Sequence, residues 1–193
     1  MSAELFPTFL KLSGRAVLVV GGGPVAASKL ASLMAAGADV RVIAPAVAPE
    51  IAGAGVHIET REFRPADLDG IWFVVAAAPP DVNRAVARAA ESRQVFVNAV
   101  DDPAHASAYL GGVVRKQGVT LAISTDGRAP ALAGLLREGL DAILPDDLHR
   151  WLEVADRSRE DWRREQVPMA SRRPRLLQAI NALYERTRTE VSS

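Results

Sequence analysis

Cysteine is absent from this chain of 193 residues. Without a thiol, the protein has no disulfide bond, no thiolate nucleophile and no Cys-based zinc site. An excess of charge of one sign is also lacking, because 23 basic residues balance 23 acidic ones. A net charge of zero gives no reason to expect nucleic acid or an anionic membrane as a partner. The histidines are few and widely separated, without the spacing of a metal site; they are His57, His105 and His149.

Long hydrophobic runs are missing as well. No apolar stretch approaches the length needed to cross a membrane, and the start, MSAELFPTFLKL, lacks the apolar region of a signal peptide. We therefore expect a cytoplasmic protein. Hydrophobic residues make up 49% of the chain, which is enough to bury a sizeable core.

Short apolar runs alternate with segments of helical spacing over the first hundred residues. Residues 16–20 (AVLVV) and 71–76 (IWFVVA) are almost wholly apolar, as in strands buried on both faces of a parallel sheet. Further strands are expected at 39–43, 57–62 and 95–97, and helices at 25–36 and 80–93. This alternation predicts an α/β fold with a doubly wound, Rossmann-type parallel sheet in the strand order 3-2-1-4-5.

The pattern changes after residue 103. Two strands are expected at 108–115 and 119–125, and an amphipathic helix at 130–144. The chain beyond this helix is helical in pattern and rich in arginine. The sequence therefore predicts three parts, a Rossmann domain, a small α+β dimerisation region and a helical C-terminal segment, at 1–107, 108–145 and 146–193.

The first candidate site is a glycine loop between the first strand and the first helix. Gly21, Gly23 and Ala26 fit the dinucleotide pattern G-x-G-x-x-A, in which the glycines permit a tight turn and close approach of a pyrophosphate. The helix N-terminus that follows favours phosphate groups. The alternative is a glycine turn that binds nothing.

The second strand ends without the acidic residue that usually holds the cofactor's ribose. The chain instead has Ile43, Ala44 and Pro45 at this place. Backbone atoms around Pro45 and Ala46 are candidates to hold the adenosine end. Arg41 would favour a 2′-phosphate, or else it points to solvent from within the strand.

Polar side chains gather after the fifth strand. Asn98 and Asp101 are expected just beyond its carboxyl end, the edge at which open α/β sheets bind ligands. A carboxylate there can take a proton or hold a cationic ring nitrogen. The alternative is that Asp101, Asp102 and Pro103 form only a turn. His105 is either close to the substrate or a surface residue.

The loop before the last amphipathic helix is the third candidate. It presents hydroxyl groups, backbone N–H groups and a guanidinium together, which suits an anionic substrate. The alternative is ordinary capping of the helix by Asp126 or a neighbour. The candidate residues are Ser124, Thr125, Gly127 and Arg128.

Four ordered motifs resemble the precorrin-2 dehydrogenase family, which forms the N-terminal part of siroheme synthases. The opening segment LFPTFLKLSGRAVLVVGGGPVAASKL is followed by FVVAAAPPDVNRAVARAAE, FVNAVDDPAHASAYL and ISTDGRAPALAGLLREGLDAILP. The resemblance is close over residues 4–150 and looser beyond. It implies oxidation of precorrin-2 to sirohydrochlorin with NAD⁺ as hydride acceptor, and in some members insertion of Fe²⁺ or Co²⁺ as a second activity.

The resemblance also assigns roles to residues. Asp101 corresponds to the family's key aspartate, which acts as a base or as a partner of ring nitrogens. The family lacks the ribose-binding acid too, so its absence here does not argue against NAD⁺. From their positions in the sequence, Asn98, His105 and the third candidate loop are the expected substrate contacts. The expected cofactor contacts are Gly21, Gly22, Gly23, Pro24, Val25, Pro45, Ala46, Ala77 and Ala78.

Two positions depart from the family pattern. Ala129 stands where members often carry a serine, and Pro24, which has no N–H, stands where some have Asp. The resemblance implies a homodimer, in keeping with an apolar stripe in 130–144 that needs a partner surface. One alternative is a sensor module that binds NAD(P)(H) without chemistry. Another, an NADP-dependent reductase of a small carbonyl compound, lacks the Tyr-x-x-x-Lys pair it would need.

Overall fold

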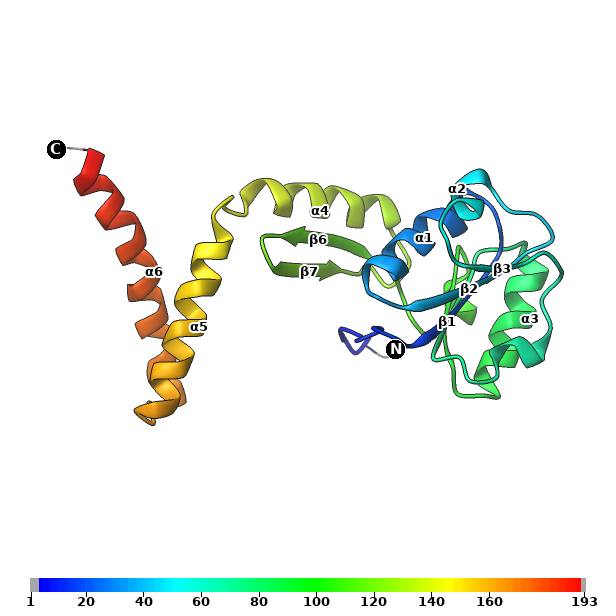
Figure 1. The fold of residues 1–193 in the computed structure, drawn as a ribbon, viewed down its shortest axis with the longest axis horizontal. Helices are drawn as coiled ribbons and strands as arrows, with labels where there is room; N and C mark the ends of the chain where they lie inside the picture. Colours follow the sequence, from blue (N-terminus) through cyan, green and yellow to red (C-terminus); the bar gives the residue numbers. More distant parts are fainter. Residues whose placement is uncertain (1–3, 192–193) are drawn as a thin grey trace. The chain divides into compact units, whose positions relative to one another are not determined.

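The computed structural model describes residues 4–191, with side chains described to residue 185. Its helices and strands form two compact units, one of residues 1–111 and 124–130 and one of residues 112–123 and 131–193 (Figure 1). The loop 124–130 thus belongs to the first unit, although the hairpin that precedes it belongs to the second. The three-part division made from the sequence stays a prediction.

A five-stranded parallel sheet forms the centre of the first unit, in the order β3-β2-β1-β4-β5. The predicted fold class and strand order are confirmed. The strands are β1 (Ala16–Val20), β2 (Asp39–Ile43), β3 (His57–Glu59), β4 (Phe73–Ala76) and β5 (Phe96–Ala99). The connecting helices are α1 (Pro24–Ala35), α2 (Pro49–Ala52), η1 (Pro65–Leu68), α3 (Pro80–Glu91) and η2 (Pro103–His105).

Alternate residues of the central strands supply two separate cores, because successive side chains of a strand point to opposite faces. Leu18 and Val74 pack on the side of α3, where Val86 and Ala90 are buried. The intervening residues of β1 and β4 pack on the side of α1. Both faces of the sheet are therefore covered, which explains why its central strands are continuously apolar.

Helix α1 begins and ends at residues whose backbone favours those positions. Pro24 takes the first helical position, where a missing N–H costs nothing. Gly37 follows the helix with φ of 73°, in the left-handed region where a C-terminal glycine is favoured.

The second unit holds an antiparallel hairpin and three helices. The strands are β6 (Gly112–Lys116) and β7 (Val119–Ile123), and the helices are α4 (Pro130–Ile143), α5 (Leu148–Arg164) and α6 (Met169–Val191). Lys116 donates from Nζ to the carbonyl oxygens of Asp141 and Leu144 at 3.1 and 2.8 Å, which satisfies the last turn of α4. Trp151 of α5 donates from Nε1 to the hydroxyl of Tyr184 of α6 at 2.6 Å.

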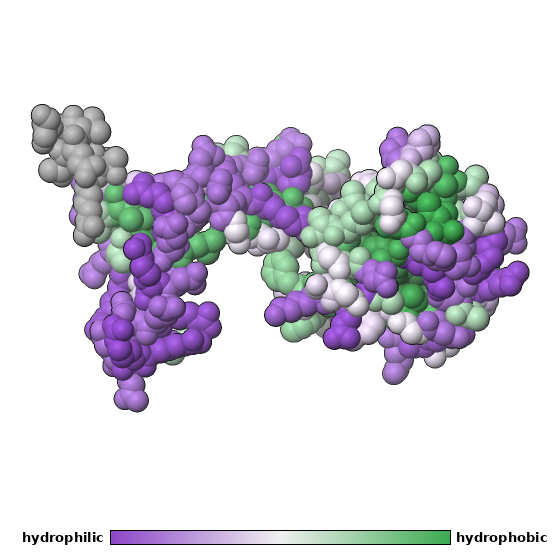
Figure 2. All heavy atoms as spheres, viewed as in Figure 1, coloured by the Kyte–Doolittle hydropathy of each residue, from purple (hydrophilic) through white to green (hydrophobic). Residues whose placement is uncertain are grey.

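Hydrophilic side chains cover most of the visible face of α5 and α6 (Figure 2). No helix of the described residues is both long and apolar enough to cross a membrane.

Candidate functional site

Parallel register brings the ends of three strands to one edge of the sheet. Val20 of β1 pairs with Ala76 of β4, and Ala76 pairs with Ala99 of β5. The glycine loop, residues 77–78 and residues 100–101 therefore leave the sheet side by side. Since neighbouring strands lie about 4.8 Å apart, the chain after β5 is about two strand spacings from the chain after β1.

The first two glycines of the loop are required by the backbone around them. Gly21 has φ of 126°, and a Cβ on it would collide with the carbonyl oxygen of Ala77. A Cβ on Gly22 would collide with the carbonyl oxygen of Ala46. These contacts fix the loop against the ends of β2 and β4.

Gly23 has different surroundings. A Cβ built there would meet no atom within 4 Å, and its φ of −86° suits any residue. It precedes α1 as the N-cap, and no side chain in the described part of the chain caps this end. The N–H groups in the first turn of a helix lack partners within the helix, and at this end Val25 is exposed whereas Ala26 is buried. The open space and the N–H of Val25 suit a pyrophosphate, with Pro24 contributing no N–H.

The end of β2 lies beside this loop. Ala48 donates from N to the carbonyl oxygen of Gly22 at 2.7 Å, which holds the turn after β2 against the glycines. Pro45 and Ala46 are exposed there, as a surface for the adenosine end of a cofactor requires. No acidic side chain stands at these positions.

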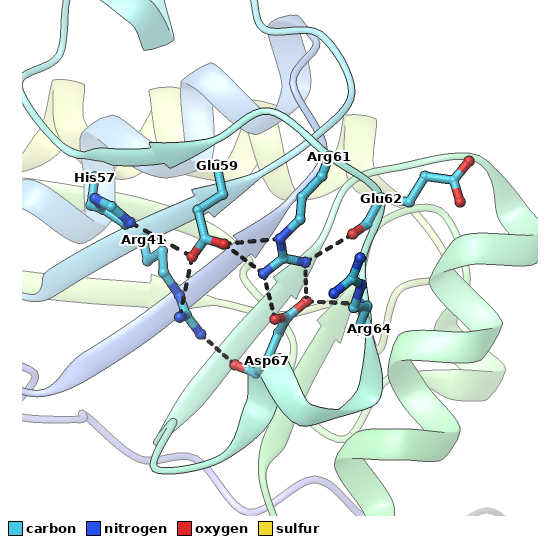
Figure 3. Close-up of polar contacts among 7 residues, drawn as sticks. All are labelled: Arg41, His57, Glu59, Arg61, Glu62, Arg64 and Asp67. Carbon is cyan, nitrogen blue, oxygen red and sulfur yellow. Dashed lines mark hydrogen bonds and ion pairs between the residues drawn. The ribbon is translucent and has the colours of Figure 1, made fainter.

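Arg41 is held in an ion-pair network rather than at the end of β2 (Figure 3). Its guanidinium donates to the carbonyl oxygen of Asp67 at 2.6 Å and lies 3.4 Å from Glu59 Oε1. Arg61 joins the same network, donating to Asp67 and to Glu59 at 2.6–2.9 Å. The interpretation of Arg41 as a free 2′-phosphate ligand is therefore disfavoured.

The same network shifts its carboxyl groups toward the ionised form. Hydrogen bonding to Arg61 holds the pKa of Asp67 below its ordinary value, against the opposing effect of burial. Hydrogen bonding to Arg61 lowers the pKa of Glu59 in the same way. The network joins β2 and β3 to η1 and explains why the chain leaves the sheet at Glu59 rather than continuing to Glu62, as the sequence had suggested.

Asn98 lies within β5 and not beyond it, which corrects its expected place. The residue is 7% exposed, and its Nδ2 donates to the carbonyl oxygen of Ala108 at 3.0 Å. The amide of Asn98 thus holds the chain at Ala108 against β5. Asp101 does lie beyond the strand, exposed and with φ of 56°. A left-handed backbone is tolerated by Asp better than by most residues.

A buried amide that the sequence analysis missed supports this edge. Asn83 of α3 is 4% exposed; its Oδ1 accepts from the N–H of Ala78 at 3.0 Å, and its Nδ2 donates to Val100 O at 3.4 Å. It therefore links the chain after β4 to the chain that leads into Asp101. The sequence does carry one indication that Asn83 is buried, because its spacing places it on the apolar face of α3 with Val86 and Ala90.

His105 forms a pair with Asp102. Its Nδ1 lies 2.8 Å from both carboxylate oxygens of Asp102, three residues earlier. The imidazole is partly exposed, with 41% of its side-chain surface accessible. The pair sits directly after β5 and next to Asp101.

The loop 124–128 packs against this segment. A Cβ on Gly127 would lie 3.0 Å from Cβ of Pro103 and 3.1 Å from Cε1 of Tyr109. Thr125 Oγ1 accepts from the N–H of Ala129 at 3.2 Å, so a neighbour of Asp126 provides the capping considered from the sequence. The hydroxyl of Ser124 accepts from Asp126 N at 3.1 Å, and Arg128 extends into solvent.

Comparison with known proteins decides the family. Residues 8–112, more than half of the chain, match the family described as "Putative NAD(P)-binding". The chain belongs to this NAD(P)-binding family. The matched residues cover the whole parallel sheet, the glycine loop and the segment after β5, whereas the loop 124–128 lies outside them.

Relatives and a solved structure extend the similarity past the NAD(P)-binding domain. The siroheme synthase of Photorhabdus laumondii is 38% identical over 186 residues, which is 94% of this chain and 40% of that protein. The siroheme synthase of Neisseria meningitidis serogroup B is 41% identical over 160 residues, 80% of this chain and 33% of that protein. The chain thus spans well under half the length of these relatives. The structure of SirC, a precorrin-2 dehydrogenase, superposes with a TM-score of 0.69 at 26% identity, covering 91% of this chain and 89% of SirC.

An NAD(P) cofactor fits the residues of this edge. The open space at Gly23 would receive the pyrophosphate, and the exposed turn at Pro45 and Ala46 would contact the adenosine. Among the described residues, no group of three or more His, Asp or Glu side chains is placed to hold a metal ion.

Proposed function

We propose that this protein is an NAD⁺-dependent dehydrogenase that oxidises precorrin-2 to sirohydrochlorin. The observation that carries the proposal is the shared sheet edge, where a dinucleotide loop and Asp101 lie about two strand spacings apart. The similarity to siroheme synthases and to SirC supports the choice of a tetrapyrrole as substrate.

The residues divide between cofactor and substrate. NAD⁺, when bound, supplies the acceptor for a hydride. The chain after β5 would hold the macrocycle, with the carboxylate of Asp101 assisting loss of a proton. The substrate's carboxylates would meet the loop that carries Arg128, which is 83% exposed. The proposed cofactor contacts are Gly21, Gly22, Gly23, Pro24, Val25, Pro45, Ala46, Ala77 and Ala78. The proposed substrate contacts are His105, Ser124, Thr125, Gly127 and Arg128, whereas Asn98, buried in β5, would act by holding the chain that follows the strand.

A preference for NAD⁺ over NADP⁺ is part of this proposal. A 2′-phosphate is normally met by a basic side chain near the end of the second strand. Arg41, which lies in β2, is held by Glu59 and by the backbone of Asp67. The turn itself carries no basic residue from Ala44 to Glu50.

A homodimer and a second activity extend the proposal. Helix α4 exposes large apolar side chains that a second copy of the chain would cover. Insertion of Fe²⁺ or Co²⁺ into sirohydrochlorin needs little protein ligation, because the macrocycle supplies four nitrogens; Asp101 would receive the displaced protons. We expect these reactions in the cytoplasm.

The proposal is tested by an anaerobic assay with enzymatically generated precorrin-2. NADH formation and the sirohydrochlorin spectrum are followed with NAD⁺ and, separately, with NADP⁺. Conversion that is faster with NAD⁺ supports the proposal, and faster metal incorporation than without protein would add the chelatase. Binding of NAD⁺ without any conversion would favour the sensor module instead.

Asp101→Asn is the sharpest variant for this assay. Asn tolerates the left-handed backbone as well as Asp does, so the loop is kept while the charge is removed. We expect kcat to fall about 100-fold or more, the usual size of a lost proton-transfer group, with NAD⁺ affinity unchanged. Asp81→Asn, at the start of α3, is the matched control and should retain full turnover. Wild-type turnover in Asp101→Asn would remove the role of Asp101.

A further inference from the structure

Asp102 and His105 form a side-chain pair that a surface turn does not itself require. Both carboxylate oxygens of Asp102 lie 2.8 Å from Nδ1 of His105. The Asp102 side chain is only 21% exposed, whereas the imidazole is 41% exposed. The carboxylate is thus the more enclosed member, and the ring is the member that reaches outward.

This geometry fixes where the imidazole proton is. An ionised carboxylate only accepts hydrogen bonds, so Nδ1 of the neutral ring must be the donor. Nε2 is then left without a proton and can accept one. The other histidines lack this arrangement: His57 approaches Glu59 through Nε2 at 3.6 Å, beyond hydrogen-bond distance, and His149 is exposed on α5.

The backbone holds the pair in place. The N–H of His105 donates to the carbonyl oxygen of Asp102 at 3.2 Å, closing the turn of η2. Tyr109 donates from its hydroxyl to Pro103 O at 2.9 Å, and Gly127 packs on the same proline. The segment is therefore supported both by β5, from which it emerges, and by the loop 124–128.

We propose that His105, oriented by Asp102, is a catalytic proton acceptor of the dehydrogenation. This inference rests on the proposed function. Oxidation of the reduced macrocycle breaks one C–H bond, whose electron pair leaves as hydride to the nicotinamide. One N–H bond of the macrocycle also breaks, its proton passes to Nε2 of His105, and a new ring double bond forms.

Asp101 and His105 have different roles because their side chains lie at different positions. Asp101, exposed beyond β5, would pair with ring N–H groups and stabilise the positive charge that develops as hydride leaves, which assists the loss of the proton that His105 accepts. His105, partly exposed, would take the proton and release it to solvent. Asp102 is a positioning residue, because it acts through the imidazole.

The test compares three variants and one control variant in the anaerobic assay. We expect His105→Gln to lower kcat about 100-fold, with the KM for NAD⁺ unchanged. His105→Ala should regain turnover when free imidazole is added, a recovery that a purely structural role would not give. Asp102→Asn should lower kcat by a smaller factor, and His149→Gln, the matched control on α5, should match the wild type.

A spectroscopic readout does not depend on turnover. Nitrogen NMR of protein labelled in its histidine rings should show His105 with Nδ1 protonated and Nε2 unprotonated, and Asp102→Asn should lose this preference. Full kcat in His105→Gln beside an active wild type would overturn this inference and leave the proposed function standing. An Nε2-protonated His105 in the wild type would overturn it too, and a wild type unable to convert precorrin-2 would overturn both.

Discussion

Three consecutive glycines meet three different surroundings. Gly21 and Gly22 face the backbones of Ala77 and Ala46, whereas Gly23 faces open space beside the N-terminus of α1. The fold itself therefore excludes a side chain at the first two glycines, whereas at the third only a bound ligand would exclude one. A sequence pattern alone treats the glycines as one motif, yet their roles separate in the structure.

Alanine substitutions should separate these roles experimentally. Gly22→Ala forces a methyl group into backbone and should lower the free energy of unfolding by about 1–3 kcal/mol or more. Gly23→Ala should change it by less than about 0.5 kcal/mol, but should weaken NAD⁺ binding about tenfold because the methyl group occupies the space for phosphate. Denaturant unfolding and calorimetric titration with NAD⁺ measure the two effects. Unchanged NAD⁺ affinity in Gly23→Ala would show that the cofactor does not approach there.

At the scale of elements, a network of charged side chains fastens the outer strands to η1. Asp67 accepts from Arg61 and from the N–H of Arg64 at 2.7–2.8 Å, and its side chain is 9% exposed. Its lowered pKa means that the folded state favours the carboxylate more than the unfolded state does. This stability is fully present above the ordinary pKa of 3.8 and is lost as pH falls through the lowered value.

Asp67→Asn should therefore cost stability only where the carboxylate is ionised. We expect a loss of about 2 kcal/mol at neutral pH, typical of a buried hydrogen-bonded charge. The difference from the wild type should shrink toward zero as pH falls below about 4. Asp69→Asn, which removes the exposed partner of Arg93, is the control and should cost about 0.5 kcal/mol or less. Equal losses at neutral pH, measured by denaturant unfolding, would contradict this account.

Most elements could be predicted because their signals are local. The apolar run of β1, the helical spacing of α3 and the proline at the start of α1 each lie within a few residues. The strand ends were predicted less well. Strand β3 ends at Glu59 because the side chain of Arg61 turns to bind Asp67. Strand β5 continues through Asn98 because the side-chain amide of Asn98 binds the carbonyl oxygen of Ala108.

The candidate site was predicted in part for the same reason. The glycine loop has a pattern within one turn, so its place before α1 could be foreseen. Asn83 acts through Ala78 and Val100, and the second of these contacts spans 17 residues. Such a contact forms only because α3 packs beside β5, and no local sequence pattern predicts this packing.

At the scale of the whole molecule, the second unit leaves an apolar surface uncovered. Leu135 and Ile143 of α4 are 65% and 75% exposed, and Leu132 and Leu136 are 48% and 45% exposed. Their spacing puts them on one face of the helix. Monomeric proteins rarely expose such a contiguous patch, so we propose that a second copy of the chain covers it.

Sedimentation equilibrium at micromolar concentration should find a dimer. Replacing Leu135 and Ile143 together by Glu places charges in the apolar surface and should shift the protein toward monomer. Glu138→Lys, exposed on α4 beside this apolar face rather than within it, changes charge by more than either single substitution and should leave the dimer intact. A wild-type monomer under these conditions would contradict the proposed assembly.

The central claim is that this chain transfers a hydride from precorrin-2 to NAD⁺ at the edge of its sheet. The most direct measurement is the stoichiometry of NADH and sirohydrochlorin formed by the wild-type protein under anaerobic conditions. Our account predicts one NADH for each sirohydrochlorin, with both formed at the same rate and neither formed without NAD⁺. Sirohydrochlorin formed no faster than without protein, in a protein that binds NAD⁺, would contradict it.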